Sequence, residues 1–280
     1  MPTRFILVLT IFLLPALALA ADPALLTDAE QAYAQDRKSE ALTLINQYLA
    51  ADTQNPKAYL LRALIRSADN QWADTLPDFD KAIALDPNRP AAYQRRAIAR
   101  FMLGHVKDAC EDFDAFNAKA PDAAPQNWQR GIALYYAGRY DDGVKQFELH
   151  RTVNPDDVEN AAWHFACLAR ANSPAAARAA LIPIEGDPRV PMAQIHQMFA
   201  GKATPADVLT AATANNPTPN ELKRHLFYAH LYIALYCESI GKDEEAKKHL
   251  TESLKHEVPD YMYGVAKVHA QLRKWPPAKM

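Results

Sequence analysis

Several motifs that would mark this chain as an enzyme or a nucleic-acid-binding protein are absent from its sequence. The 280 residues include only 8 glycines, and Gly131, Gly138 and Gly143 lie too far apart to form a phosphate-binding loop. No GxxxxGK[ST], HExxH or GxSxG motif is present. The net charge of −2 gives no electrostatic reason to expect a nucleic-acid partner. We therefore predict a protein that is not an enzyme and needs no cofactor or metal.

Cysteine is also scarce, and the three cysteines contain no CxxC motif. An odd number excludes a fully paired disulfide framework. Each one, at Cys110, Cys167 and Cys237, lies in an apolar stretch of helical character. We expect three small buried side chains; one disulfide with one remaining thiol is the alternative.

The residue types that are plentiful favour helices. Alanine is abundant, and the 20 prolines fall mostly between apolar runs. Alanine stabilises helices more than any other residue, and proline is tolerated at helix starts and just beyond helix ends. The composition therefore predicts an all-α protein built from many short helices.

The first twenty residues have the pattern of a secretory signal peptide. Arg4 precedes the apolar run 5–14, Pro15 breaks the run, and Ala18 and Ala20 are small residues suited to cleavage before Ala21. The run is shorter than the roughly 20 residues that span a bilayer, although an uncleaved anchor is the alternative. The pattern predicts an exported, periplasmic or otherwise extracytoplasmic protein that keeps no stable membrane anchor after cleavage.

The chain repeats itself at an offset of 34 residues. This period and its pattern are identified as the tetratricopeptide repeat, in which two helices form one unit. The small residues allow close helix crossing, the glycines suit a turn, the phenylalanines fill the space between helices, and the prolines end each unit. The matched sets are Tyr59 with Tyr93; Arg62 with Arg96 and Arg130; Ala63 with Ala97 and Gly131; Asn70 with Gly104 and Gly138; Phe79 with Phe113 and Phe147; and Pro87 with Pro121 and Pro155.

The repeat predicts an all-α, right-handed superhelical solenoid of tetratricopeptide helix hairpins over residues 21–280. An irregular helical insert and a C-terminal capping helix complete it, because the ends of a stacked core need shielding. The predicted units are repeats at 23–56, 57–89, 90–123 and 124–157, a degenerate repeat at 158–190, the insert at 191–217, a repeat-like pair at 218–258 and a cap at 260–274.

The second half of the chain resembles the NlpI-type lipoproteins of bacterial envelopes. The resemblance rests on "RGIALYYAGR" (130–139), "NPDD" (154–157), "FAGKATPADVL" (199–209) and "FYAHLYIALYCESIGKDEEAKKHL" (227–250), in matching order over roughly residues 57–275. It implies a homodimeric envelope scaffold that brings a protease and peptidoglycan-active enzymes together. The family's lipid-attachment cysteine is missing here, which favours a soluble protein.

The first helix of each hairpin is expected to line the concave face of the superhelix. This face is apolar and aromatic, and aromatic residues dominate protein-binding hot spots. Either a partner's apolar segment binds here, or the chain's own C-terminal helices or a second subunit fill the groove. The candidate partner-binding residues are Leu60, Gln94, Arg95, Ile98, Phe101, Trp128, Ile132, Tyr135 and Tyr136.

The recurring arginines Arg62, Arg96 and Arg130 have two interpretations. We expect them to pair with carboxylates of an adjacent helix, and the candidates are Asp78, Asp80 and Asp112. Ligand binding is the alternative.

Three functions remain open at this point. The first is an exported scaffold or adaptor for protein–protein interactions in the cell envelope. The second is a secreted enzyme or metal-binding protein with a site in the irregular region 186–225, where His196, Asp207 and His225 would be the first candidates. The third is a purely structural dimer.

Overall fold

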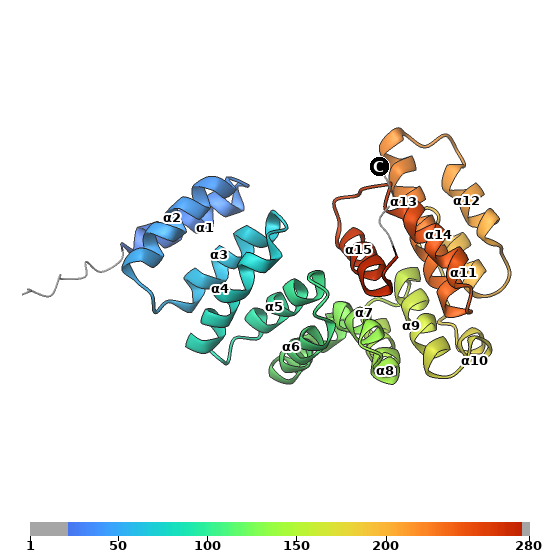
Figure 1. The fold of residues 1–280 in the computed structure, drawn as a ribbon, viewed down its shortest axis with the longest axis horizontal. Helices are drawn as coiled ribbons and strands as arrows, with labels where there is room; N and C mark the ends of the chain where they lie inside the picture. Colours follow the sequence, from blue (N-terminus) through green and yellow to red (C-terminus); the bar gives the residue numbers. More distant parts are fainter. Residues whose placement is uncertain (1–21, 276–280) are drawn as a thin grey trace, which may run out of the picture.

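The computed structural model describes residues 22–275, and this part of the chain contains helices and no strand. Consecutive helices pack as hairpins that stack side by side, which confirms the predicted all-α solenoid (Figure 1). The predicted signal peptide lies outside the described residues. Within residues 22–275, no helix combines the length and hydropathy that crossing a membrane requires.

Four hairpins form the N-terminal part of the solenoid, and a short 3-10 helix precedes the fourth. They are α1 (Pro23–Ala34) with α2 (Lys38–Ala51), α3 (Pro56–Ala68) with α4 (Trp72–Leu85), α5 (Pro90–Met102) with α6 (Val106–Lys119), and, after η1 (Pro121–Gln126), α7 (Trp128–Tyr136) with α8 (Tyr140–Arg151).

The C-terminal part is less regular. Helices α9 (Val158–Ala171) and α10 (Pro174–Ala179) occupy the degenerate fifth repeat, and α11 (Met192–Phe199) and α12 (Pro205–Thr213) occupy the insert. The long α13 (Pro219–Ser239) pairs with α14 (Asp243–Ser253), and α15 (Tyr261–Arg273) is the last helix.

Helix starts follow from local capping chemistry. Proline stands in the first helical position of α1, α3, α5 and α13, where its missing N–H leaves no hydrogen bond unmade. At α13, the Thr218 side chain accepts a hydrogen bond from the Glu221 N–H, while the Glu221 carboxylate accepts one from the Thr218 N–H. The sequence thus fixes where this helix begins.

The turns inside the four N-terminal hairpins share one backbone conformation at 34-residue intervals. The φ angles are 58° at Asp36, 58° at Asn70, 81° at Gly104 and 76° at Gly138. Glycine adopts this left-handed conformation without strain, and Asn and Asp tolerate it better than other residues. The predicted turn positions are therefore confirmed, and Asp36 extends the series to the first hairpin.

The predicted close crossing of paired helices is also confirmed. A Cβ atom added to Gly131 would lie 2.5 Å from Cζ of Phe147, which is 1% exposed. The phenyl ring of α8 therefore fills the space that a side chain on α7 would need. A smaller core cluster lies under α1–α3, whereas one continuous cluster runs from α5 to α15.

The last helices turn back over the solenoid. In Figure 1, α15 lies beside α13 and above α5 and α7, and it packs against α5 and α14. The hairpin of α1 and α2 lies at the opposite end of the molecule. The C-terminal helices therefore cover only one end of the row of first helices.

Candidate functional site

Equivalent positions on the first helices become more deeply buried along the chain. In the last turn of these helices, Tyr33 and Ser67 are half-buried, whereas Phe101 and Tyr135 are completely buried. One turn earlier the same series runs from exposed through half-buried to buried, at Glu30, Leu64, Ile98 and Ile132. The concave face is therefore open at the first two hairpins and covered at the fourth.

A buried polar network holds this cover in place. Tyr135 of α7 donates a hydrogen bond of 2.9 Å to Oε2 of Glu238, which lies on α13 and is 3% exposed. Arg273 of α15 donates to the other carboxylate oxygen, and Nε2 of His269 lies 3.2 Å from Oε2. One carboxylate thus joins three helices.

Aromatic contacts complete the cover. The Tyr136 hydroxyl and Nδ1 of His269 share a hydrogen bond of 3.0 Å. The ring of Tyr261 stacks on Phe101 at 6.2 Å and meets Trp128 edge-on at 5.1 Å. Such pairs stabilise by about 0.5–1.5 kcal/mol beyond the area they bury. Helix α15 therefore occupies the groove at the third and fourth hairpins.

The electrostatics of the network favour an ionised Glu238. Burial alone would raise the pKa of this carboxyl, but the close contacts with His269 and Arg273 outweigh burial and lower the pKa to about 2. Burial also raises the pKa of the Tyr135 hydroxyl well above its usual value, so this hydroxyl stays a donor. The network is therefore an anion surrounded by its donors.

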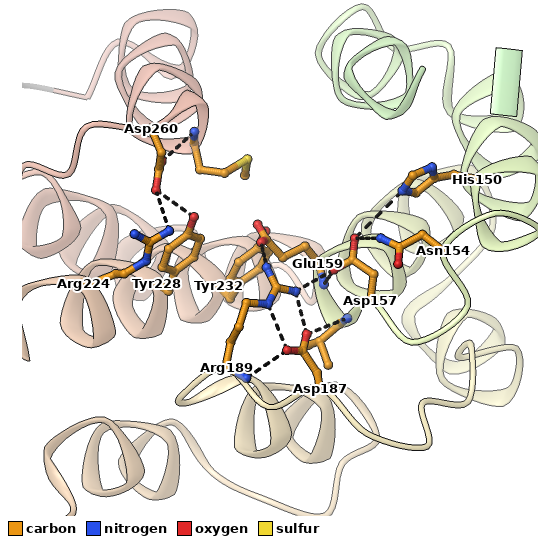
Figure 2. Close-up of polar contacts among 12 residues, drawn as sticks. His150, Asn154, Asp157, Glu159, Asp187, Arg189, Arg224, Tyr228, Tyr232 and Asp260 are labelled. Atoms are coloured by element: carbon orange, nitrogen blue, oxygen red, sulfur yellow. Dashed lines mark hydrogen bonds and ion pairs between the residues drawn. The ribbon is translucent and has the colours of Figure 1, made fainter. Parts of the chain in front are cut away.

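A second feature is a partly open pocket of about 330 Å³ at the N-terminal ends of α9 and α15. Its apolar wall includes Trp128, Trp163, Tyr228 and Tyr261. Its polar wall consists of His150, Asn154, Asp157, Glu159, Asn160, Arg189 and Asp260. Figure 2 shows Asp260 and Tyr228 on one side and His150, Asn154 and Asp157 on the other.

Arg189 is the centre of the polar wall. Its guanidinium lies 2.6 Å from Asp187, 2.8 Å from Asp157 and in direct contact with Glu159. Tyr232 of α13 donates a hydrogen bond to the second Glu159 oxygen. Burial raises the pKa of Glu159 despite these contacts, whereas the hydrogen bonds from Arg189 lower the pKa of Asp187 against the opposing effect of burial. The segment before α11 is thereby fastened to the start of α9.

Comparison with known proteins identifies the fold. No protein-family model matches the sequence, and no match is found among curated proteins. A tetratricopeptide repeat protein from Parabacteroides merdae superposes with a TM-score of 0.57 at 16% identity, over 88% of this chain and 97% of that chain. The C-terminal part of a TPR repeat-containing protein from Cytophaga hutchinsonii gives 0.53 at 13% identity, over 86% and 98%.

The match to MamA from Desulfovibrio magneticus, from its residue 41 to its end, gives a TM-score of 0.52 at 14% identity, over 71% of this chain and 100% of that chain. The chain has the tetratricopeptide-repeat fold. At these identities the likeness extends to the fold and no further.

The repeating arginines of this tetratricopeptide fold are structural, as predicted. Each reaches a carboxylate or amide on the second helix of its own hairpin and another on the preceding hairpin. Arg96 contacts Asp112 at 2.6 Å and Asp80 at 2.7 Å. The equivalent partners are Asp78 and Asn46 for Arg62, and Gln146 and Asp114 for Arg130. These contacts of Arg62, Arg96 and Arg130, here called the arginine ladder, therefore join neighbouring tetratricopeptide units.

The candidate partner-binding residues divide into three groups by their surroundings. Phe101, Ile132 and Tyr135 are at most 1% exposed and pack against the chain's own helices. In this structure the chain's own helices therefore surround these three side chains, which is one of the alternatives left open above. Trp128 and Tyr136 are half-buried beneath α15. Leu60, at the open end on α3, is half-buried; on α5 of the third hairpin, Gln94 and Ile98 are half-buried and Arg95 is exposed. Partner binding by these four stays a prediction.

The residues suspected of metal binding in region 186–225 have local structural contacts. Nε2 of His196 lies 2.9 Å from the Ile182 carbonyl, and Nδ1 of His225 lies 3.1 Å from the Ala212 carbonyl. Asp207 caps the start of α12. Within residues 22–275, no three His, Cys, Asp or Glu side chains are arranged to hold a metal ion.

The structure also places residues that sequence reasoning either anticipated or missed. All three cysteines lie among the described residues, buried and unpaired, as expected. The cluster of Arg189, Glu159 and Asp187 was missed, because its members come from separate elements and lie outside the repeating pattern. The only signal was the run of charged residues around the irregular segment 185–189.

Proposed function

We propose that this protein is a scaffold that binds a segment of another protein on the open concave face of its first two hairpins. The burial gradient along the first helices is the observation that carries this proposal. Leu64 and Ser67 of α3 are half-buried, while the equivalent Ile132 and Tyr135 of α7 are fully buried. A solenoid whose groove is filled at one end and open at the other leaves side chains such as Tyr33 and Leu64 available to a partner helix or strand.

We further propose that the scaffold acts outside the cytoplasm. The signal-peptide pattern of residues 1–20 supports export. The mass of the protein purified from an extracytoplasmic fraction tests this: a chain beginning at Ala21 is expected, and a full-length chain confined to the cytoplasm would contradict export.

The resemblance to NlpI-type lipoproteins supports a finer proposal, in which the partner is an envelope protease or a peptidoglycan-active enzyme. The same resemblance supports a homodimer. Light scattering of the purified protein tests the dimer, with twice the chain mass as the expected result and a monomer at micromolar concentration as the opposing one.

Partner recovery from an envelope extract tests the docking face. The informative variant is Leu64→Arg, which places a charge on the open face. The control is Ala84→Arg on the exposed side of α4. We expect at least one protein to be recovered with the unchanged chain and the control but not with Leu64→Arg. Equal recovery by all three chains would refute docking at this face.

A further inference from the structure

The pocket beneath α15 carries excess negative charge. Among its lining residues are three carboxylates, Asp157, Glu159 and Asp260, and one guanidinium, that of Arg189. Outside the lining, Asp187 shares Arg189, and Arg224 lies 3.7 Å from Asp260 with its side chain 59% exposed. The pocket walls therefore attract a cation.

Polar atoms among the buried lining residues lack partners. Asn160 is 3% exposed and Trp163 is 2% exposed; within residues 22–275, neither Oδ1 of Asn160 nor Nε1 of Trp163 has a hydrogen-bond partner. The Tyr261 hydroxyl is likewise buried without one. Buried polar groups are normally hydrogen-bonded, because a buried group that has lost its water and gained no partner destabilises the fold. The pocket wall therefore includes three residues that each carry a buried polar atom without a hydrogen-bond partner.

An anionic ligand fits the pocket poorly, although two helices begin at its edge. The Asp157 side chain accepts the Glu159 N–H at 3.1 Å, and Asp260 accepts the Met262 N–H at 3.0 Å. The Asp187 carboxylate accepts the Val158 N–H. Since the chain's own carboxylates occupy these donors, an anion would meet negative charge at both helix starts.

A metal ion also fits poorly. Within residues 22–275, no cluster of metal-ligating side chains is found. A long basic side chain of a polypeptide supplies both a cation for the carboxylates and an apolar stem for the aromatic wall.

We propose that this pocket binds an arginine side chain of a partner polypeptide. The guanidinium would lie among the aromatic rings of Trp128, Trp163 and Tyr228 and face Glu159 and Asp157. Guanidinium groups stack on aromatic faces and pair with carboxylates, which suits this wall better than the more strongly hydrated ammonium of lysine. The volume of about 330 Å³ lies at the small end of ligand pockets and matches one side chain rather than a larger ligand.

This inference rests on the proposed scaffold function but concerns a different surface from the open groove at Leu64. The two therefore fail separately. Loss of partner recovery in Leu64→Arg reports on the groove, whereas the experiment below reports on the pocket alone.

The test is an NMR titration of the purified protein with a blocked arginine, N-acetyl-arginine methylamide. The probe signals are the indole N–H resonances of Trp128 and Trp163, and Trp72, on the distant α4, is the internal control. We expect the first two signals to shift and the third to stay. The uncharged citrulline analogue should bind at least about tenfold more weakly, since a hydrogen bond to a charged group is worth roughly 1.5–3 kcal/mol.

A variant tests whether the Glu159 carboxylate contributes to arginine binding. Glu159→Gln keeps the side-chain shape while removing one carboxylate, and Glu111→Gln makes the same change on the exposed face of α6. Arginine binding should weaken about tenfold in the first and stay unchanged in the second. The comparison with citrulline needs no variant, so misfolding of Glu159→Gln would not rescue a failed proposal.

Three results would overturn the inference. They are the absence of any shift at Trp128 and Trp163 with the arginine probe, equal binding of arginine and citrulline, and stronger shifts with inorganic phosphate than with arginine. The last result would assign the pocket to an anion.

Discussion

The hydroxyl of Tyr135 donates a hydrogen bond of 2.9 Å to the carboxylate of Glu238, 103 residues further along the chain. This contact fastens α7 to α13, and Arg273 extends it to α15. The solenoid therefore folds its own C-terminal helices into one end of its groove. The open end remains at α1 and α3.

Removing the hydroxyl should weaken this fastening. We expect Tyr135→Phe to lower the free energy of unfolding by roughly 1–3 kcal/mol, because Glu238 loses a donor in a buried site. Urea denaturation measures the effect. The matched control is Tyr33→Phe at the equivalent half-buried position of α1, where no hydrogen bond of the hydroxyl is found within the described residues. An equal effect in both variants would show that the buried contact contributes nothing specific.

The Glu238 carboxylate should make stability fall in acid. Its pKa is lowered from 4.5 to about 2 in the folded protein, so the unfolded chain takes up its proton first as the pH falls. The stabilisation is complete above pH 4.5, on the order of 3 kcal/mol, and is lost as the pH falls toward 2. Unfolding free energies measured at several pH values should fall less steeply below pH 4.5 in Glu238→Gln than in the unchanged protein. An equally steep fall in both proteins would contradict this.

The two ion pairs of Arg96 allow a buried carboxylate partner to be compared with an exposed one. Arg96 pairs with Asp112, whose side chain is 4% exposed, and with Asp80, whose side chain is 57% exposed. Asp112→Asn should destabilise by roughly 3 kcal/mol, because Arg96 and Arg100 keep their charges without a buried partner. Asp80→Asn should cost less than about 1 kcal/mol, since solvent screens the pair. Similar losses of stability in the two variants would mean that burial does not determine how much each ion pair contributes.

A pair of histidines should add a second pH dependence at milder acidity. Nδ1 of His230 on α13 lies 2.9 Å from Nδ1 of His249 on α14, so only one of these nitrogens carries the shared proton. Burial first, and then the charges of His249 and His256, lowers the pKa of His230 from 6.5 to about 4. Between these pH values the unfolded chain binds a proton that the folded chain does not, so acidification favours unfolding.

The His230→Asn variant should therefore lose less stability than the unchanged protein between about pH 7.5 and about pH 5. The control is His105→Asn, at an exposed position before α6. Thermal unfolding at the two pH values measures the difference. The same pH sensitivity in all three chains would exclude His230 as its source.

The repeating part of the fold was predictable from residues whose role recurs in every unit. Position 131 must hold a small residue because the Phe147 ring packs directly against it, and Gly104 and Gly138 have the left-handed conformation that their turns require. Because the same requirements recur every 34 residues, comparing the chain with itself at that offset reveals the pattern. Arg96 and its partners repeat for the same reason. Local steric and conformational requirements, repeated in several units, were therefore sufficient to predict this part of the fold.

The sites themselves depend on contacts between distant segments. Nothing local marks Glu238 as the partner of Tyr135, and Asp187 and Glu159 meet Arg189 only because the irregular segment returns to the start of α9. Two arrangements of the aromatic groove were therefore left open by the sequence, with packing by the chain's own helices or a second subunit favoured over a partner's segment. In this structure, Phe101 and Tyr135 contact residues of α15.

The most direct test of the scaffold account is crosslinking in cells that produce the protein, with a photo-reactive residue replacing Leu60 on the half-buried face of α3 and, as a reference, Glu111 on the exposed face of α6. We predict crosslinks from position 60 to a second, different protein and none to that protein from position 111. Crosslinks from position 60 only to residues of this same chain would contradict the account, because the open end of the groove would then be closed by the chain itself.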